Sequence, residues 1–249
     1  MLTLSFRTCL VAALLLFPSV ATASPMIESL PALYSHSEYR RTAEFAADPS
    51  IVDPTTLYNA VSKATNWRLA TYPDGQAVSN YATIYADWLY ITGSSVLHFI
   101  ADMDVDCDGV SYLCTGNKSG YHETSYGHLD ASQVPYYVIP ARFLQQYYPK
   151  VQPNALGAII CNGKILYGIL GDTNGAETQV IGEASYMLAR TCFPEDNLGG
   201  NRGHTPHDIA YIVFGNQIPQ GIEDKTIDID ALKKLGDEQL RMLVTILKL

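Results

Sequence analysis

The chain has 249 residues, with 16 Lys or Arg against 25 Asp or Glu and a formal net charge of −9 at pH 7. This acidic balance argues against nucleic acid and anionic membranes as partners, because like charges repel, and it is compatible with a cationic partner. Many secreted proteins are acidic only to remain soluble, so the charge by itself identifies no partner.

The first 23 residues have the pattern of a secretory signal peptide. Arg7 precedes an apolar run that ends at Phe17, and Ala21 and Ala23 are spaced as in a cleavage site. The run is shorter than the roughly 20 residues that a membrane helix needs. We therefore expect cleavage after Ala23 and an extracellular protein whose residues 24–249 form a single domain.

Four cysteines lie beyond the expected cleavage site. An even number in an oxidising compartment indicates two disulfides, for which three pairings are possible. We favour the local pair of Cys107 with Cys114 and the longer closure of Cys161 with Cys192. Asn117 begins an Asn-Lys-Ser sequon, which makes it a candidate glycosylation site on an exposed loop.

The predicted strands are short and rich in β-branched and aromatic residues. Residues 25–50 should form an extended lead-in with at most one short helix. After a Pro-Asp-Gly turn at residues 73–75, we expect strands at 83–91 and 96–106.

Four later apolar runs have the same character as these strands. They cover residues 136–140, 155–161, 164–172 and 209–215. Asn162-Gly163, between the second and the third run, predicts a β-hairpin over residues 155–172.

Helical periodicity is limited to two segments. One covers residues 182–190, and the other covers residues 228–249, where leucines recur at near-helical spacing and a break is expected at Gly236. The expected fold class is therefore mainly β with peripheral helices.

Acidic residues alternate at the end of the second expected strand. Asp102, Asp104, Asp106 and Asp108 would project from one face, which is electrostatically costly unless a cation lies there. Three explanations remain open: a calcium loop, a solvated loop tip, and a groove whose carboxylates pair with substrate ammonium groups. The calcium spacing is incomplete, because Thr115 stands where an EF-hand has a bidentate Glu.

Two further acids lie at predicted element boundaries, where a rigid scaffold can direct a side chain into a cleft. Asp172 ends an apolar strand within Gly-Asp-Thr-Asn-Gly, and Glu183 opens the predicted helix within Ile-Gly-Glu-Ala-Ser. Each also has an ordinary explanation, Asp172 as a turn residue and Glu183 as a first-turn acid favoured by the helix dipole.

His204 and His207 form a His-x-x-His pair in a loop. The pair could bind a metal or orient a water, although a capping or packing histidine is the commoner explanation. We keep His204 as a candidate substrate-binding residue. The chain has no G-x-S-x-G, H-E-x-x-H or phosphate-loop motif, so the common esterase, zinc protease and nucleotide-binding classes have no support.

Four segments carry a resemblance to a known family. They are ADMDVDCDG, GHLDASQVPYYVIP, AIICNGKILYGILGDTNGAETQVIGEAS and GHTPHDIAYIVFG. In this order they resemble the fungal-type chitosanases of glycoside hydrolase family seventy-five, over nearly the whole chain after the leader. The resemblance implies an inverting endo-hydrolase of chitosan without metal or organic cofactor, whose essential acids match Asp172 and Glu183. The third segment is also similar to the double-psi β-barrel of expansin-like proteins.

Inverting hydrolysis requires a carboxylic acid at the leaving oxygen and a carboxylate that activates water, roughly 6.5 to 9.5 Å apart. We assign Glu183 as the acid and Asp172 as the base, and the reverse assignment keeps the same pair. A helix start would tend to keep Glu183 ionised, so the acid role requires burial or a nearby carboxylate.

Chitosan and its oligosaccharides are the expected partners, and a monomer is the expected state. Asp104 and Asp106, with Asp102 and His204, are the expected substrate-binding residues, because chitosan amines are largely charged at mildly acid pH whereas the acetamides of chitin are neutral. The competing class is a non-catalytic expansin-like polysaccharide-binding protein, which would bind chitosan and release no sugar.

Overall fold

The computed structural model describes residues 44–75, 80–91, 93–109, 114 and 121–249. The expected signal peptide, Thr115 and the sequon at Asn117 lie outside these ranges. Within them, no helix has both the length and the apolar character that crossing a bilayer requires.

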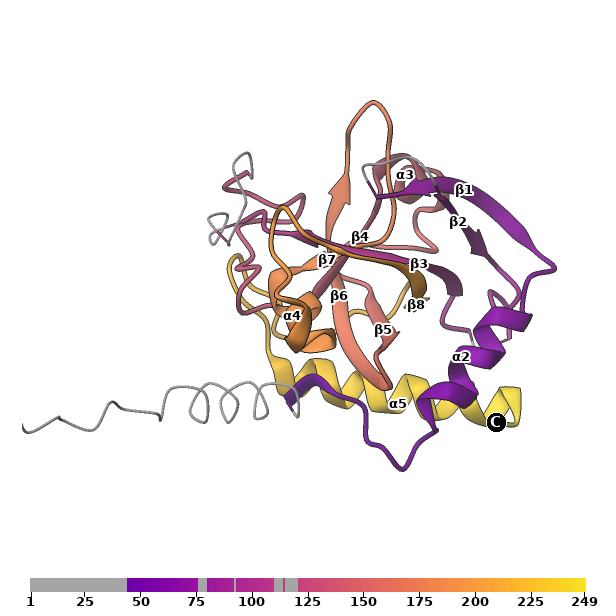
Figure 1. The fold of residues 1–249 in the computed structure, drawn as a ribbon. Helices are drawn as coiled ribbons and strands as arrows, with labels where there is room; N and C mark the ends of the chain where they lie inside the picture. Colours follow the sequence, from indigo (N-terminus) through magenta and orange to yellow (C-terminus); the bar gives the residue numbers. More distant parts are fainter. Residues whose placement is uncertain (1–43, 76–79, 92, 110–113, 115–120) are drawn as a thin grey trace, which may run out of the picture.

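Of the eight strands in the described residues, six close into a barrel, and the first two form a hairpin at its side (Figure 1). The strands are β1 Arg68–Asp74, β2 Asn80–Tyr85, β3 Val96–Asp106, β4 Tyr136–Pro140, β5 Leu156–Cys161, β6 Lys164–Asn174, β7 Glu183–Ser185 and β8 His204–Phe214. Their order is β1-β2-β3-β7-β4-β6-β5-β8, and a second pairing of β8 with β3 closes the ring. The pairs β3–β7 and β4–β6 are parallel, and the others are antiparallel.

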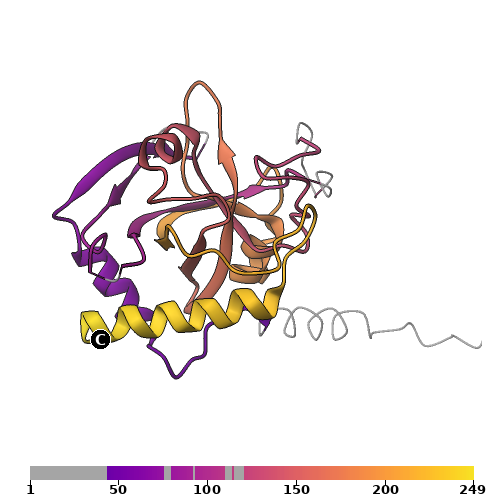
Figure 2. The ribbon, with the colours of Figure 1, turned by 180° about the vertical axis from the view of Figure 1, so that it is seen from behind.

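Helices lie around the barrel, so the expected class of mainly β with peripheral helices is confirmed. They are α2 Pro54–Lys63, α3 Ala141–Tyr147, α4 Tyr186–Cys192, the short 3-10 helix η1 Pro194–Asp196, and α5 Ile229–Leu247. The long helix α5 runs along one end of the barrel and packs against β5 and β6 (Figure 1, Figure 2). Its buried face includes Leu232, Leu240 and Leu243, and the Asp228 side chain caps its first turn by accepting from the Ala231 N–H.

The hairpin of β5 and β6 is the one that Asn162-Gly163 predicts. Asn162 and Gly163 have φ values of 46° and 69°, the left-handed conformation of a two-residue turn whose twist matches the flanking strands. Cys161 pairs directly with Lys164, so the strands continue in register from the turn. Nearly every residue of both strands is buried, which explains the continuous apolar runs in the sequence.

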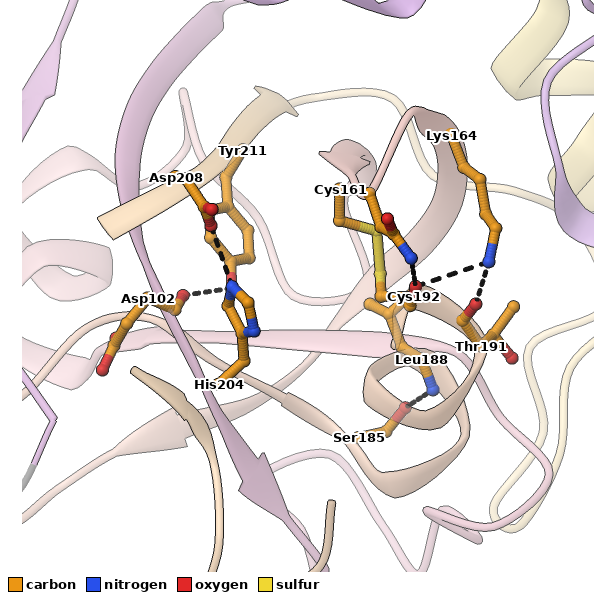
Figure 3. The surroundings of a disulfide bond; sticks show 11 residues. Asp102, Cys161, Lys164, Ser185, Leu188, Thr191, Cys192, His204, Asp208 and Tyr211 are labelled. Atoms are coloured by element: carbon orange, nitrogen blue, oxygen red, sulfur yellow. Dashed lines mark hydrogen bonds and ion pairs between the residues drawn. A yellow bond between two sulfur atoms is a disulfide. The ribbon is translucent and has the colours of Figure 1, made fainter. Parts of the chain in front are cut away.

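Both disulfides join the cysteines in the predicted pairs, Cys107 with Cys114 and Cys161 with Cys192. The second ties the hairpin to the end of α4 (Figure 3). Beside it, Lys164 Nζ donates to the carbonyl oxygen of Thr191 at 2.7 Å. A cation at the helix C-terminus satisfies a carbonyl without an intrahelical partner and stabilises the helix dipole.

Buried tyrosines connect the barrel core to the strand that carries the acids. Tyr211 is almost fully buried and its hydroxyl donates to the backbone carbonyl of Asp102 at 2.9 Å (Figure 3). Tyr136 donates in the same way to the carbonyl of Asp108 at 3.1 Å. A buried phenol needs such a partner, and here the partner is the backbone beside an acidic side chain. The two contacts therefore fix the course of the acidic segment.

Two strand predictions need correction. The strand expected at 83–91 ends at Tyr85, because the later residues form a turn in which Trp88 is buried and its ring lies 4.3 Å from that of His98. Trp88 and Leu89 of this turn are buried without strand pairing, whereas Tyr90 and Ile91 are exposed. The turn expected at residues 73–75 is reached only at Gly75, since Asp74 still belongs to β1.

The helix predictions also differ from the structure. The helix expected over residues 182–190 begins at Tyr186, and Glu183 lies instead in β7. Helix α5 continues through Gly236 without a break. Helices α2 and α3 were not predicted, although Asp53 caps α2 by accepting from the Thr56 N–H at 2.9 Å and Pro54 occupies its first position.

Gly236 persists inside α5 because the helix approaches the barrel there. A Cβ at this position would lie 2.6 Å from atoms of the buried Tyr167 ring. We expect Gly236→Ala to lower the melting temperature by a few degrees, since overpacking costs roughly 1–3 kcal/mol and exceeds the ~1 kcal/mol gained in helix propensity. Thermal unfolding followed by circular dichroism measures the change, with the exposed Lys234→Ala as control. A higher melting temperature for Gly236→Ala would contradict the close packing.

Candidate active site

The sheet brings the two predicted catalytic acids onto one row. Glu183 of β7 pairs with Asp104 of β3 on one side and with Val138 of β4 on the other, and Val138 also pairs with Asp172 of β6. Directly paired residues project from the same face of a sheet. Two strand spacings of about 4.8 Å place the backbones of Glu183 and Asp172 roughly 9–10 Å apart.

A bulge in β6 sets the face on which Asp172 lies. Tyr137 pairs with Leu170 and Val138 with Asp172, so Gly171 is the extra residue. A Cβ on Gly171 would lie 2.5 Å from the Cβ of Tyr136, which explains why the position is a glycine. Without the extra residue, Asp172 would project from the opposite face.

A groove with two adjoining sections runs over this row, and we call it the acidic groove. The larger section has a volume of about 660 Å³ and contains Asp106, Asp108 and Asp172. The second section has a volume of about 460 Å³ and is lined by Asp74, Asp102 and Asp104, among others. Glu183, Val105 and Gly200 line both sections. Glu183 therefore lies where they meet, with carboxylates on either side.

Glu183 has the environment of a protonated acid. The pKa of Glu183 is raised to about 7, chiefly by burial; a hydrogen bond opposes this rise, and the nearby charges of Asp104 and Asp172 add to it. In that hydrogen bond Asn174 Nδ2 donates to Glu183 Oε2 at 3.2 Å. The side chain starts from a strand and not from a helix N-terminus, so no helix dipole keeps it ionised.

Asp172 has a different environment, in which its oxygen accepts several hydrogen bonds. Burial raises the pKa of Asp172 above its ordinary value, and hydrogen bonds from Ser125 and Thr173 partly offset this rise. The backbone N–H groups of Ser125 and Thr173 donate to Oδ1 at 2.9 and 2.6 Å, and the Ser125 hydroxyl donates to the same oxygen. Donors directed at a carboxylate favour its charged form. The two acids are thus held in unequal environments.

The alternating acids of β3 do line the groove, in the order of the sequence. Burial, followed by the charges of Asp104 and Asp74, raises the pKa of Asp102 to about 8, and burial raises the pKa of Asp106 well above its usual range. Carboxylate oxygens of Asp106, Asp108 and Asp172 lie within 4.8 Å of one another. This trio is not the calcium-loop series, because Asp104 lines the other section and the third member comes from β6.

His204 has a packing role in this structure. Its ring stacks on Phe193 with centroids 3.7 Å apart. Nδ1 lies 3.2 Å from an Asp196 oxygen. Nε2 lies 3.0 Å from an Asp208 oxygen, and Figure 3 shows this second contact. His204 is not among the residues that line the acidic groove. This environment favours the packing explanation over the expected contact with substrate.

Three residues of the site were not singled out in the sequence. Asn174 stands within the Gly-Asp-Thr-Asn-Gly motif and could have been found there. Ser125 carries no local signal, because it reaches Asp172 from a loop 47 residues away. Asp74 looked like a turn residue, yet it is buried at the groove and lies 2.7 Å from His207 Nδ1.

Comparison with known proteins gives the family. The sequence profile described as "Fungal chitosanase of glycosyl hydrolase group 75" matches residues 103–239, which include Asp104, Asp172 and Glu183. The chain belongs to this family. The match covers β3 from Met103 onward, the hairpin of β5 and β6, β7 and most of α5.

Curated relatives of the family carry related names. "Endo-chitosanase C" from Aspergillus oryzae is 43% identical over 213 residues, covering 83% of this chain and 56% of that protein. "Endo-chitosanase" from Aspergillus fumigatus is 39% identical over 132 residues, covering 45% and 53%. A second "Endo-chitosanase" from A. oryzae is 34% identical over 191 residues, covering 66% and 77%. The chain spans little more than half the length of the first two.

The raised pKa values predict an unusual dependence of stability on pH. Asp102 binds its proton more tightly in the folded than in the unfolded protein, so unfolding releases a proton between its unfolded pKa of 3.8 and its folded pKa of about 8. Stability must then fall as pH rises through this window, and Glu183 acts in the same direction up to about 7. We expect the melting temperature to decrease from pH 5.5 to pH 8.5, and Asp102→Asn to reduce this decrease.

Differential scanning calorimetry across that pH range measures both effects. For a domain of this size, 1 kcal/mol corresponds to roughly 2–4 °C in melting temperature. Glu238→Gln, an exposed change on α5, serves as the control and should leave the slope unchanged. A melting temperature that is constant or rises toward pH 8.5 would contradict the raised pKa values.

Proposed function

We propose that the protein is a secreted endo-chitosanase that hydrolyses β-1,4 linkages between glucosamine residues of chitosan with inversion. The observation that carries the proposal is the row in which Glu183 and Asp172 flank Val138 on adjacent strands. Two strand spacings separate the two backbones, and side chains that project from the same face at that spacing can hold their carboxyl groups the roughly 6.5–9.5 Å apart that an inverting pair needs to admit a water. A retaining pair requires carboxyl groups only about 5 Å apart.

The unequal environments support the assignment of roles. A pKa of about 7 keeps Glu183 largely protonated at mildly acid pH, so it can donate a proton to the leaving oxygen. Asp172 accepts hydrogen bonds from Ser125 and Thr173 that stabilise its carboxylate, so it can take a proton from water. Environments that push two carboxylates apart in pKa are typical of acid and base pairs.

The substrate preference follows from the charge of the groove. Asp102, Asp104 and Asp106 would face ammonium groups on successive glucosamine residues. Their pKa values are raised in the free protein, so an arriving ammonium group would displace a proton and form an ion pair. The neutral acetamides of chitin could not do this, which favours chitosan. The names of the relatives agree with this substrate.

The remaining parts of the proposal concern the context of the domain. Two disulfides are consistent with an oxidising, extracellular location. Residues 24–249 would form a single catalytic domain that acts as a monomer, and the barrel would be of the double-psi type. These statements stay predictions.

The alternative is a non-catalytic polysaccharide-binding protein with an expansin-like barrel. It would retain the acidic groove and bind chitosan. It would have no need for two acids in unequal environments on the two strands that flank β4. Product formation separates the two classes, because only the enzyme releases reducing ends.

We expect Glu183→Gln and Asp172→Asn each to lower the rate of chitosan hydrolysis by roughly 10²–10⁴-fold, since each removes one proton-transfer partner. Viscosity and reducing ends are followed together on highly deacetylated chitosan at mildly acid pH. Wild type should lose viscosity rapidly with few new ends. The exposed Glu177→Gln in the nearby loop is the control and should behave as wild type. Binding of chitosan without any release of ends by wild type would refute the enzyme proposal.

The pH dependence of kcat/KM tests the acid role of Glu183. Activity should fall as pH rises through about 7, where Glu183 loses its proton. Asp104→Asn removes a negative charge that raises the pKa of Glu183, so the basic limb should move to lower pH. If the pH at which activity falls is unchanged or higher in Asp104→Asn, Glu183 is not the group whose deprotonation causes the fall.

A further inference from the structure

One face of β3 extends beyond the acidic groove. Alternate residues share a face of a strand, so Asp106, Asp104 and Asp102 are followed on the same face by Ile100 and His98. From Asp106 to His98 the strand rises by roughly 26 Å, which exceeds the length of a single sugar residue. Along this path the carboxylates give way to uncharged side chains.

A separate pocket lies over the uncharged end of this face. It has a volume of about 370 Å³. Its lining comes from α2, β2, β3 and β8 and includes Tyr58, Tyr81, Thr83, Tyr85, His98 and Ile100. None of the described residues that line it has a carboxylate. We call it the aromatic pocket.

The aromatic pocket adjoins the acidic groove. His207 lines the pocket, Asp74 lines the groove, and His207 Nδ1 lies 2.7 Å from Asp74 Oδ2. Tyr81 in the pocket and Asn80 in the groove are consecutive residues of β2. The pocket and the groove therefore share a boundary at the contact between His207 and Asp74.

The residues that line the pocket offer aromatic surface and hydroxyl groups, and the carboxylates of Asp74 and Asp208 lie outside this lining. His98 is fully buried, and burial lowers its pKa to about 4, so its ring is neutral at mildly acid pH. Neither ring nitrogen has a hydrogen-bond partner among the described residues. The Tyr81 side chain is prominent at the surface, with 59% of the residue exposed. An ammonium group placed here would lose water without a carboxylate of the lining to pair with.

We propose that the aromatic pocket is a distal subsite for an uncharged N-acetylglucosamine residue of a partially acetylated chain, while the acidic groove holds the glucosamine residues. This inference rests on the proposed function. The apolar face of the sugar stacks on Tyr81, and the acetamide methyl group contacts apolar surface such as Ile100. The protein thereby binds preferentially those chains that have an acetylated residue at this end.

Tyr81→Ala tests the subsite, because the exposed side chain can be removed without disturbing the core. We expect kcat/KM on partially acetylated chitosan to fall roughly three- to tenfold, the usual worth of an aromatic contact, and kcat/KM on fully deacetylated chitosan to change much less. Tyr81→Phe retains the ring and should behave as wild type. Tyr90→Ala removes another exposed tyrosine, outside the pocket, and should change neither substrate.

A binding measurement separates failure of the subsite from failure of the enzyme proposal. Isothermal titration of the Glu183→Gln variant with a β-1,4-linked tetramer of N-acetylglucosamine should give binding that weakens roughly three- to tenfold when Tyr81→Ala is added. Equal losses on both chitosans, or tetramer binding unaffected by Tyr81→Ala, would overturn the subsite while leaving the hydrolase intact. Absence of hydrolysis in wild type with tetramer binding still dependent on Tyr81 would overturn the enzyme proposal and retain the pocket.

Discussion

Repulsion between carboxylates on neighbouring strands is the constraint that shapes this protein. Asp104 and Glu183 are directly paired, and further acids precede and follow Asp104 on the same strand face. Within the described part of the chain, Arg202 is the one Lys or Arg side chain that lines the acidic groove. With so little countercharge, burial and mutual repulsion raise the pKa of Asp102 to about 8 and that of Glu183 to about 7, so these two acids can keep their protons at mildly acid pH.

The closed barrel makes this unfavourable arrangement possible. A strand of only three residues, β7, lies between β3 and β4, and ring closure through β8 prevents the acidic strand from moving away. The hydroxyl groups of Tyr211 and Tyr136 hold the backbone at Asp102 and Asp108 from inside the core. The apolar core of the barrel thus stabilises the fold, while repulsion between the acids of the groove face favours separation of the strands that carry them.

The sequence pattern predicted correctly those elements whose structure is determined by neighbouring residues. The turn at Asn162-Gly163, the strand over residues 96–106 and both cysteine pairings were predicted correctly. Glu183 was placed in a helix because a three-residue strand has no periodicity, and its pairing with Asp104 depends on a chain segment about 80 residues away. The alternation of acidic residues along the strand predicted that Asp104 shares a face with Asp102 and Asp106. The pairing of Asp172 with Glu183 was predicted only from the resemblance to the chitosanase family.

The bulge at Gly171 has a consequence for how such proteins can vary. Because it decides the face on which Asp172 projects, the site depends on a count of backbone residues between the hairpin turn and the acid. Insertions or deletions of a single residue within β6 would reverse that face even if every side chain were retained. The loop between β6 and β7 has no such restriction, because its length does not alter either register. Natural length variation should therefore accumulate in that loop, and β6 should change by substitution alone.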